Sequence, residues 1–350
     1  MKKLIVSLGL ALTLSLGATF EDGVKAFEKE DYKTAITIFE DLASKNHVLS
    51  QYGLGLMYAN GDGVKQDYLK AKEWYEKAAA QGYAKAQNSL GVMYDNGKGV
   101  KQDYKKAKEW YEKAAIQGHA IAQYNLGVMY DNGKGVKQDY LKAKEWYEKA
   151  AAQGFADAQF NLGLMYTNGD GVKQDYLKAK EWYEKAAVQG YVKAQYNLGV
   201  MYANGKGVKQ DYLKAKEWYE KAAAQGGADA QYNLGFMYAN GKGAKQDYKK
   251  AKELWEKAAV QGYVKAQYNL GVMYANGKGV KQDYLKAKEW YEKAAAQGGA
   301  EAQYNLGVMY ANGQGVKQDK RVAKQLYGKA CDGGIQMGCD NYKLLNQQGY

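Results

Sequence analysis

Several residue types that carry chemistry are scarce in this chain of 350 residues, which contains no proline, two cysteines, two histidines and one arginine. The histidines, His47 and His119, form no H-x-x-x-H or similar metal-binding set. None of the serines begins S-x-x-K, the arrangement that places a lysine one helical turn from a nucleophile. The single arginine argues against nucleic-acid binding, because phosphate and base recognition rely on its planar guanidinium group. We therefore expect no metal, no cofactor and no nucleic-acid partner.

Long apolar runs are also scarce, and the one at residues 4–16 is too short to span a membrane. It follows two lysines and ends in Ser15-Leu16-Gly17, with small residues at the positions that a signal peptidase reads. Residues 1–17 are thus predicted to be a signal peptide. No cysteine stands at the cleavage position, which excludes a lipoprotein anchor. We expect an exported protein, periplasmic or secreted, without a membrane span.

The chain is rich in repetition. Its tryptophans recur at a regular spacing of 36 residues. At one position of this series the tryptophan is missing, and Leu254 stands there with Trp255 beside it. A period of about 36 residues is typical of a solenoid, in which each unit stacks on its neighbours because it cannot bury its own apolar face. The other members of the series lie 36 or 72 residues apart: Trp74, Trp110, Trp146, Trp182, Trp218 and Trp290.

One unit, around residues 122–153, contains two amphipathic helices. Leu126 and Met129 fall on one face of the first helix. Gly127 lies beside this face, and a glycine repeated in a helix predicts close approach of the partner helix. Gly133 ends the first helix, because glycine tolerates the left-handed conformation of a C-cap. Asp139 is predicted to cap the second helix by accepting a backbone N–H bond.

This pattern resembles the Sel1-like repeat family, a relative of the tetratricopeptide repeats with a longer loop between its two helices. The resemblance implies an all-α fold, a right-handed α/α superhelical solenoid of about eight helix-pair repeats plus caps. The residues that carry it in the unit described are Ala122, Leu126, Gly127, Tyr130, Gly133, Gly135, Val136, Asp139, Lys142, Ala143, Trp146, Tyr147, Lys149, Ala150, Ala151 and Gly154.

The predicted domain order follows from where the pattern holds. After the signal peptide at 1–17, residues 18–46 form a divergent helix pair without the long glycine loop, and we expect them to cap the N-terminus. Residues 47–334 hold the Sel1-like repeats. Residues 335–350 are predicted to form a C-terminal capping helix and a tail.

The two cysteines lie near the C-terminus. Cys331 ends a second helix and Cys339 begins the next first helix, and these two ends cross closely in this fold. Export to an oxidising compartment favours a disulfide between them; the alternative is two separate buried thiols. The placement resembles that of the Helicobacter cysteine-rich proteins, which are secreted and carry such a pair in every repeat.

Two classes of function remain. Some members of that cysteine-rich group are described as penicillin-binding proteins or weak β-lactamases, so the resemblance implies a β-lactam-binding protein or weak β-lactamase as the alternative. An active site, however, is a unique constellation, and the middle units here are nearly interchangeable. A repeated surface favours extended binding. We therefore interpret the chain as a monomeric scaffold or adaptor for a protein or peptide partner, with no catalytic residues.

Two columns of residues on the first helices are candidates for that binding, because the first helices line the inner face of such a superhelix. Asparagines could pair with the backbone of an extended peptide; otherwise they bond to neighbouring backbone and the tyrosines serve packing. The asparagine column is Asn125, Asn161, Asn197, Asn233, Asn269 and Asn305, and the tyrosine column is Tyr124, Tyr196, Tyr232, Tyr268 and Tyr304, with Phe160 at the equivalent position.

The net charge of +12 comes mostly from lysines on the second helices and in the loops. Interspersed glutamates favour a solvated helix face. An anionic glycan bound to this face is the other interpretation, and it predicts binding that weakens steeply with salt.

Overall fold

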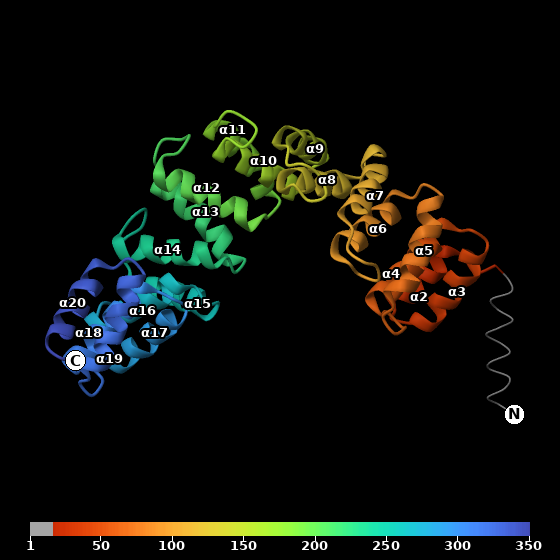
Figure 1. Ribbon diagram of the computed structural model, residues 1–350. Coiled ribbons are helices and arrows are strands. Elements are labelled where there is room, and N and C mark those ends of the chain that lie inside the picture. Colours follow the sequence, from red (N-terminus) through yellow and green to blue (C-terminus); the bar gives the residue numbers. More distant parts are fainter. Residues whose placement is uncertain (1–16) are drawn as a thin grey trace, which may run out of the picture. The chain divides into compact units, whose positions relative to one another are not determined.

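The computed structural model describes residues 17–350, so the predicted signal peptide lies, apart from Gly17, outside the described residues. These residues form 19 α-helices. The chain divides into two compact units, Met1–Gln174 and Asp175–Tyr350. Within each unit, successive helices pack in antiparallel pairs (Figure 1). The all-α fold of repeated, stacked helix pairs that the sequence predicts is therefore confirmed within each unit.

The first unit begins with a helix pair and continues with repeats whose helices are mostly 13 residues long. Its helices are α2 (Phe20–Glu28), α3 (Tyr32–Ser44), α4 (Val48–Asn60), α5 (Tyr68–Ala80), α6 (Ala84–Asn96), α7 (Tyr104–Ile116), α8 (Ala120–Asn132), α9 (Tyr140–Ala152) and α10 (Ala156–Asn168).

The second unit ends with a single helix after its last pair. Its helices are α11 (Tyr176–Val188), α12 (Val192–Asn204), α13 (Tyr212–Ala224), α14 (Ala228–Asn240), α15 (Tyr248–Val260), α16 (Val264–Asn276), α17 (Tyr284–Ala296), α18 (Ala300–Asn312), α19 (Lys320–Asp332) and α20 (Gln336–Gln347). In the part of the chain described, none of the helices is both long and apolar enough to cross a membrane.

A tyrosine ring lies against a bare glycine where the two helices of a repeat meet. A Cβ atom added to Gly127 of α8 would lie 2.5 Å from the ring of Tyr147 of α9, and Tyr147 is fully buried. The close approach predicted from the repeated glycine is confirmed, since no larger residue leaves room for the ring. The same pairing joins Gly55 to Tyr75, Gly91 to Tyr111, Gly199 to Tyr219, Gly271 to Tyr291 and Gly307 to Tyr327.

The helix ends also follow the predicted local signals. Gly133 stands after α8 in the left-handed conformation, with φ of 68°. The Asp139 carboxylate accepts a bond from the backbone N–H of Lys142 at the start of α9. The first helix begins at Ala120, two residues earlier than the apolar pattern suggested, and the ring nitrogen Nδ1 of His119 accepts a bond from the N–H of Ala122 at its start.

The core is assembled piecewise along each unit. One cluster combines Tyr111 of α7 with Leu126 and Met129 of α8, and the ring of Trp146 from α9 packs against it. The tryptophan of one repeat therefore packs on a core that the first helix of its own repeat shares with the second helix of the preceding one. Each repeat needs its neighbour to bury its apolar face, as expected for a solenoid.

The contacts at the two ends of the described chain differ from those of the middle repeats. In the N-terminal pair, Phe39 takes the place of the buried tyrosine and packs against Gly23. At the C-terminus the expected disulfide joins Cys331 of α19 to Cys339 of α20, with 4.6 Å between their Cα atoms. The last residue is also held, because Nζ of Lys324 donates to the backbone O of Tyr350.

The glycine–tyrosine contact can be tested with two neighbouring glycines of α4. We expect Gly55→Ala to lower the free energy of unfolding by about 1–3 kcal/mol, because the new methyl group overlaps the Tyr75 ring. Gly53→Ala is the matched control: its Cβ would meet Phe39 at an ordinary 3.6 Å, so the helix should gain about 0.5–1 kcal/mol. Urea denaturation compares the two; equal effects of the two substitutions would refute the close approach.

The disulfide should stabilise the C-terminal helix. Closing a short loop of this length restricts the unfolded chain and contributes about 2–3 kcal/mol. We expect the oxidised protein to contain no reactive thiol. Replacement of both cysteines by alanine should speed hydrogen exchange in α20 and leave α8, in the other unit, unchanged. Two reactive thiols in the native oxidised protein would contradict the bridge.

Candidate functional site

The tyrosine column packs between neighbouring aromatic rings. Tyr124 lies half-buried between Tyr147 of the second helix, with ring centroids 5.8 Å apart, and Phe155 at the start of the next repeat, at 5.2 Å. The other members make equivalent contacts, so the rings serve packing whatever else they do. The pairs are Tyr196–Tyr219, Tyr232–Tyr263, Tyr268–Tyr291 and Tyr304–Tyr327.

The asparagine column bonds to the tyrosines of the preceding repeat. Asn161 hydrogen-bonds to the hydroxyls of both Tyr124 and Tyr147. Where an asparagine, Asn88, replaces the column tyrosine, Asn125 donates to its Oδ1 at 3.2 Å. These two asparagines thus tie their repeats to the ones before. In the second unit Asn233 pairs with Tyr196 and Tyr219, Asn269 with Tyr232, and Asn305 with Tyr268 and Tyr291, while Asn197 lies half-buried on α12.

Burial keeps these tyrosines neutral. It raises the pKa of Tyr124 and, more strongly, that of Tyr147, and the nearby Asp131 carboxylate raises both further. The hydroxyls therefore stay protonated at neutral pH and can donate hydrogen bonds. The two columns present amide and hydroxyl groups on the first-helix side of each repeat, partly exposed and partly used by the fold.

A second polar network joins the repeats and was not foreseen from the sequence. Nε2 of Gln123 donates to the backbone O of Ala115 in the preceding repeat at 3.1 Å. Oε1 of Gln123 accepts a bond from Gln153 at the end of α9, at 2.8 Å. These glutamines recur in every repeat, and this recurrence is the feature of the sequence that could have indicated the network. They are almost completely buried: Gln51, Gln87, Gln123, Gln159, Gln195, Gln231, Gln267 and Gln303.

Lysines of the second helix contact their own helix. Nζ of Lys144 lies 2.7 Å from the Glu148 carboxylate. Nζ of Lys149 lies over the ring of Trp146, 4.0 Å from its centroid. Both contacts recur in other repeats, and both leave the charged groups partly exposed to solvent.

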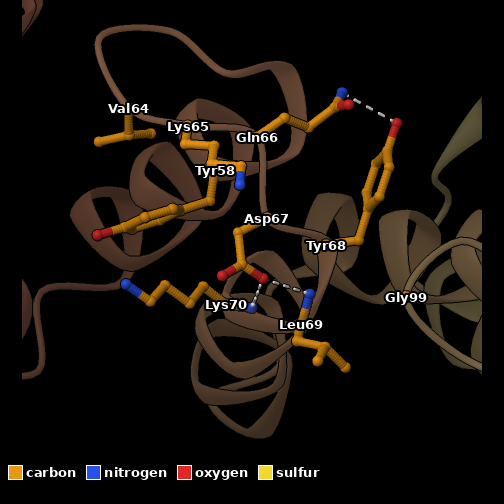
Figure 2. A pocket seen from close by; sticks show the side chains of 9 residues that line it. All are labelled: Tyr58, Val64, Lys65, Gln66, Asp67, Tyr68, Leu69, Lys70 and Gly99. Carbon is orange, nitrogen blue, oxygen red and sulfur yellow. Dashed lines mark hydrogen bonds between the residues drawn. The ribbon is translucent and has the colours of Figure 1, made fainter.

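The hollow drawn in Figure 2, of about 610 Å³, lies at the loop between α4 and α5. The Asp67 carboxylate points back to the backbone N–H groups of Leu69 and Lys70, so it serves as a helix cap (Figure 2). Gln66 donates to the Tyr68 hydroxyl and to the backbone O of Ala59. These polar groups satisfy the loop itself, and we interpret the hollow as turn geometry.

One serine–histidine contact resembles catalytic geometry without providing it. Nδ1 of His47 lies 2.9 Å from Oγ of Ser50. Both residues belong to the first turn of α4, where His47 also accepts a bond from the N–H of Ser50. Ser50 is fully buried, so no substrate can reach its hydroxyl in this arrangement.

Two further hollows lie on the first-helix side of the repeats. One, of about 360 Å³, is apolar and lies beside α2 and α4, with Phe20, Leu49 and Leu56 in its wall. The other, of about 320 Å³, lies between α12 and α14 in the second unit and contains two column residues, Tyr196 and Asn233.

A scan against protein families matches the Sel1 repeat over most of the chain. The matched residues are 48–83, 84–119, 120–155, 156–191, 192–227, 228–263, 264–299 and 300–335. No curated protein gave a match.

Two solved structures are similar to this chain over most of its length. A protective antigen present in uropathogenic Escherichia coli strains is 38% identical, with 89% of this chain and 67% of that chain covered and a TM-score of 0.83. A Sel1 repeat protein from Oxalobacter formigenes is 35% identical, with 91% and 93% covered and a TM-score of 0.71. Cysteine rich protein B of Helicobacter pylori is 28% identical over 39% of this chain and 98% of its own, with a TM-score of 0.31.

The buried tyrosines predict how stability depends on pH. Burial raises the pKa of Tyr327 from 10.0 to about 12, whereas the unfolded chain loses this proton near pH 10. The contribution of this pKa difference to the free energy of unfolding is thus fully present below about pH 10 and is lost as the pH rises toward 12. We expect the urea midpoint to fall as the pH rises from about 10 to about 12, and tyrosine absorbance to show two ionisation phases. A single phase near pH 10 in the folded protein would contradict this burial.

Proposed function

The chain belongs to the Sel1 repeat family, and on that premise we propose that it is an exported adaptor that holds an extended segment of a protein partner against its first helices. The observation that carries this proposal is the regular series of tyrosine and asparagine side chains on those helices. Five of the eight repeats, those that begin at residues 120, 192, 228, 264 and 300, offer a tyrosine hydroxyl and an asparagine amide at the same two positions. Amide groups can pair with a peptide backbone as donors and acceptors.

The identity of two repeats supports binding over catalysis. Residues 192–227 and 264–299 are the same in all 36 positions. Duplicated repeats supply the same small contact twice, which adds affinity for an extended partner. They supply no unique arrangement of reacting groups, and the Ser50 hydroxyl beside His47 is fully buried. These points support an adaptor in preference to a β-lactamase; turnover of nitrocefin by highly purified protein would reverse that preference.

Export is supported by three separate features. Residues 1–17 have the charge and apolar pattern of a signal peptide. The Cys331–Cys339 disulfide suits an oxidising compartment. The E. coli relative is described as a protective antigen, and an antigen must be reached by the immune system. N-terminal sequencing of the mature protein should begin at Ala18, and a chain recovered with Met1 intact would argue against export.

The asparagine column can be tested against a phage-displayed library of linear peptides. We expect the wild-type chain to enrich peptides, and Asn269→Ala with Asn305→Ala to bind them about 10-fold more weakly, because two backbone-pairing groups are lost. The matched control changes Asn276 and Asn312, which end the same two helices, α16 and α18.

The control variant should bind like the wild type, and circular dichroism should show that both variants remain folded. No enrichment by the wild type, or equal binding by the column variant and the control, would contradict peptide binding through this column.

A further inference from the structure

The repeat at 228–263 differs from its counterparts at a position beside the binding columns. Phe236 of α14 is 42% exposed, although a smaller aliphatic residue would fit the same place. The equivalent residues in the other seven repeats are valine or leucine: Leu56, Val92, Val128, Leu164, Val200, Val272 and Val308.

The duplicated repeats allow a direct comparison within the second unit. The two identical repeats are followed by residues 228–263 and 300–335, respectively. The first of these has Phe236 and Lys242 where the second has Val308 and Gln314. The preceding repeats do not differ, and these two side chains are among the residues that distinguish one repeat junction from the other.

Both distinguishing residues line the hollow of about 320 Å³ between α12 and α14. Tyr196 and Tyr219 pack against each other in its wall, with ring centroids 5.9 Å apart. Nζ of Lys242 lies 5.8 Å from the centroid of the Phe236 ring. The hollow therefore has aromatic walls and a single charged group, which is positive. Its volume falls at the lower end of the range for pockets that hold small ligand groups.

The polar groups in this hollow include an available donor. Nδ2 of Asn233 donates to the Tyr196 hydroxyl at 3.3 Å. Tyr196 accepts this bond, so its own proton can be donated to a ligand. The ordinary tyrosine pKa of about 10 already leaves this proton in place at neutral pH, and burial raises the pKa of Tyr196 further. A carbonyl or carboxylate oxygen is the acceptor that such a hydroxyl takes, and the Lys242 ammonium group is a second donor in the lining.

The net charge of the second unit favours an acidic ligand. Residues 175–350 contain 27 lysines and arginines against 17 aspartates and glutamates, so the second unit carries most of the net charge of +12. A positive surface attracts acidic segments and disfavours basic ones.

We propose that the hollow formed by Tyr196, Tyr219, Asn233, Phe236 and Lys242 anchors an acidic peptide segment, taking one aromatic or large apolar side chain against Phe236 and an adjacent carboxylate on Lys242. This site rests on the proposed function and gives it a specific position and partner chemistry. A buried aromatic anchor with a charged neighbour is a common hot spot of protein interfaces, so the repeats on either side add weaker contacts to one strong one.

The test uses an array of short glycine–serine peptides in which two adjacent positions are varied through all amino acids. The full chain should select an aromatic or large apolar residue next to aspartate or glutamate. The double variant Phe236→Val and Lys242→Gln, which copies the 300–335 repeat, should bind the selected peptide about 10-fold more weakly. The reciprocal variant Val308→Phe and Gln314→Lys should bind more of it per chain.

A further comparison isolates the charge. Changing the aspartate of the selected peptide to asparagine should weaken binding to the wild type, and should have little effect on Lys242→Gln alone, because the pair is then already broken. Both variants take residues found at the equivalent positions of this chain, and unchanged thermal midpoints will show that they fold.

The outcomes separate the site from the function. Peptides that bind the wild type and the double variant equally, or a preference for basic residues, would refute this site and leave peptide binding in place. A wild-type chain that binds no peptide on the array would refute the proposed function together with the site.

Discussion

The structure depends on the contact between a buried aromatic ring of the second helix, a tyrosine in most repeats, and the bare glycine of the first helix. At Gly127 the ring of Tyr147 occupies the space of a side chain, which brings the two helix backbones close together. Glycine inside a helix costs about 0.5–1 kcal/mol relative to alanine. The burial of a whole aromatic ring, roughly 1.5–3 kcal/mol, offsets that cost.

The same ring then connects the repeat to its neighbour. The Tyr147 hydroxyl is reached by Asn161 of the following repeat, and the buried Gln123 joins its own repeat to the preceding one. Stability is therefore a sum of short-range contacts between adjacent repeats. This arrangement leaves the first-helix side free to vary at single positions, such as Phe236, without disturbing the rest of the unit. A specific binding site can thus arise in one repeat of an otherwise uniform series.

The sequence predicted the fold well because its signals are local. A glycine at Gly133 and an aspartate at Asp139 act on the nearest backbone groups, and their spacing alone defines the helix ends. The role of Gln123 could not be predicted, because its partners lie on two other helices and depend on side-chain reach. The missing tryptophan at Leu254 is visible in the sequence, but its structural consequence is not. Trp255 takes the place of the buried tyrosine and donates through Nε1 to the backbone O of Tyr232.

The candidate site was predicted only in part. The columns containing Tyr196 and Asn233 were recognised from their repetition, and their bonds to each other became visible only in three dimensions. Phe236 and Lys242 were overlooked because single departures from a repeat carry no periodic signal.

Removal of residues 192–263 tests the central claim most directly. The identical repeat 264–299 then follows Tyr191 in place of 192–227, so the sequence around the new junction is that of the intact chain. If each repeat is stabilised by its immediate neighbours, the shortened chain will keep the same helical signal per residue in circular dichroism and unfold cooperatively. Loss of that signal would show that the fold depends on contacts beyond adjacent repeats and would contradict the account.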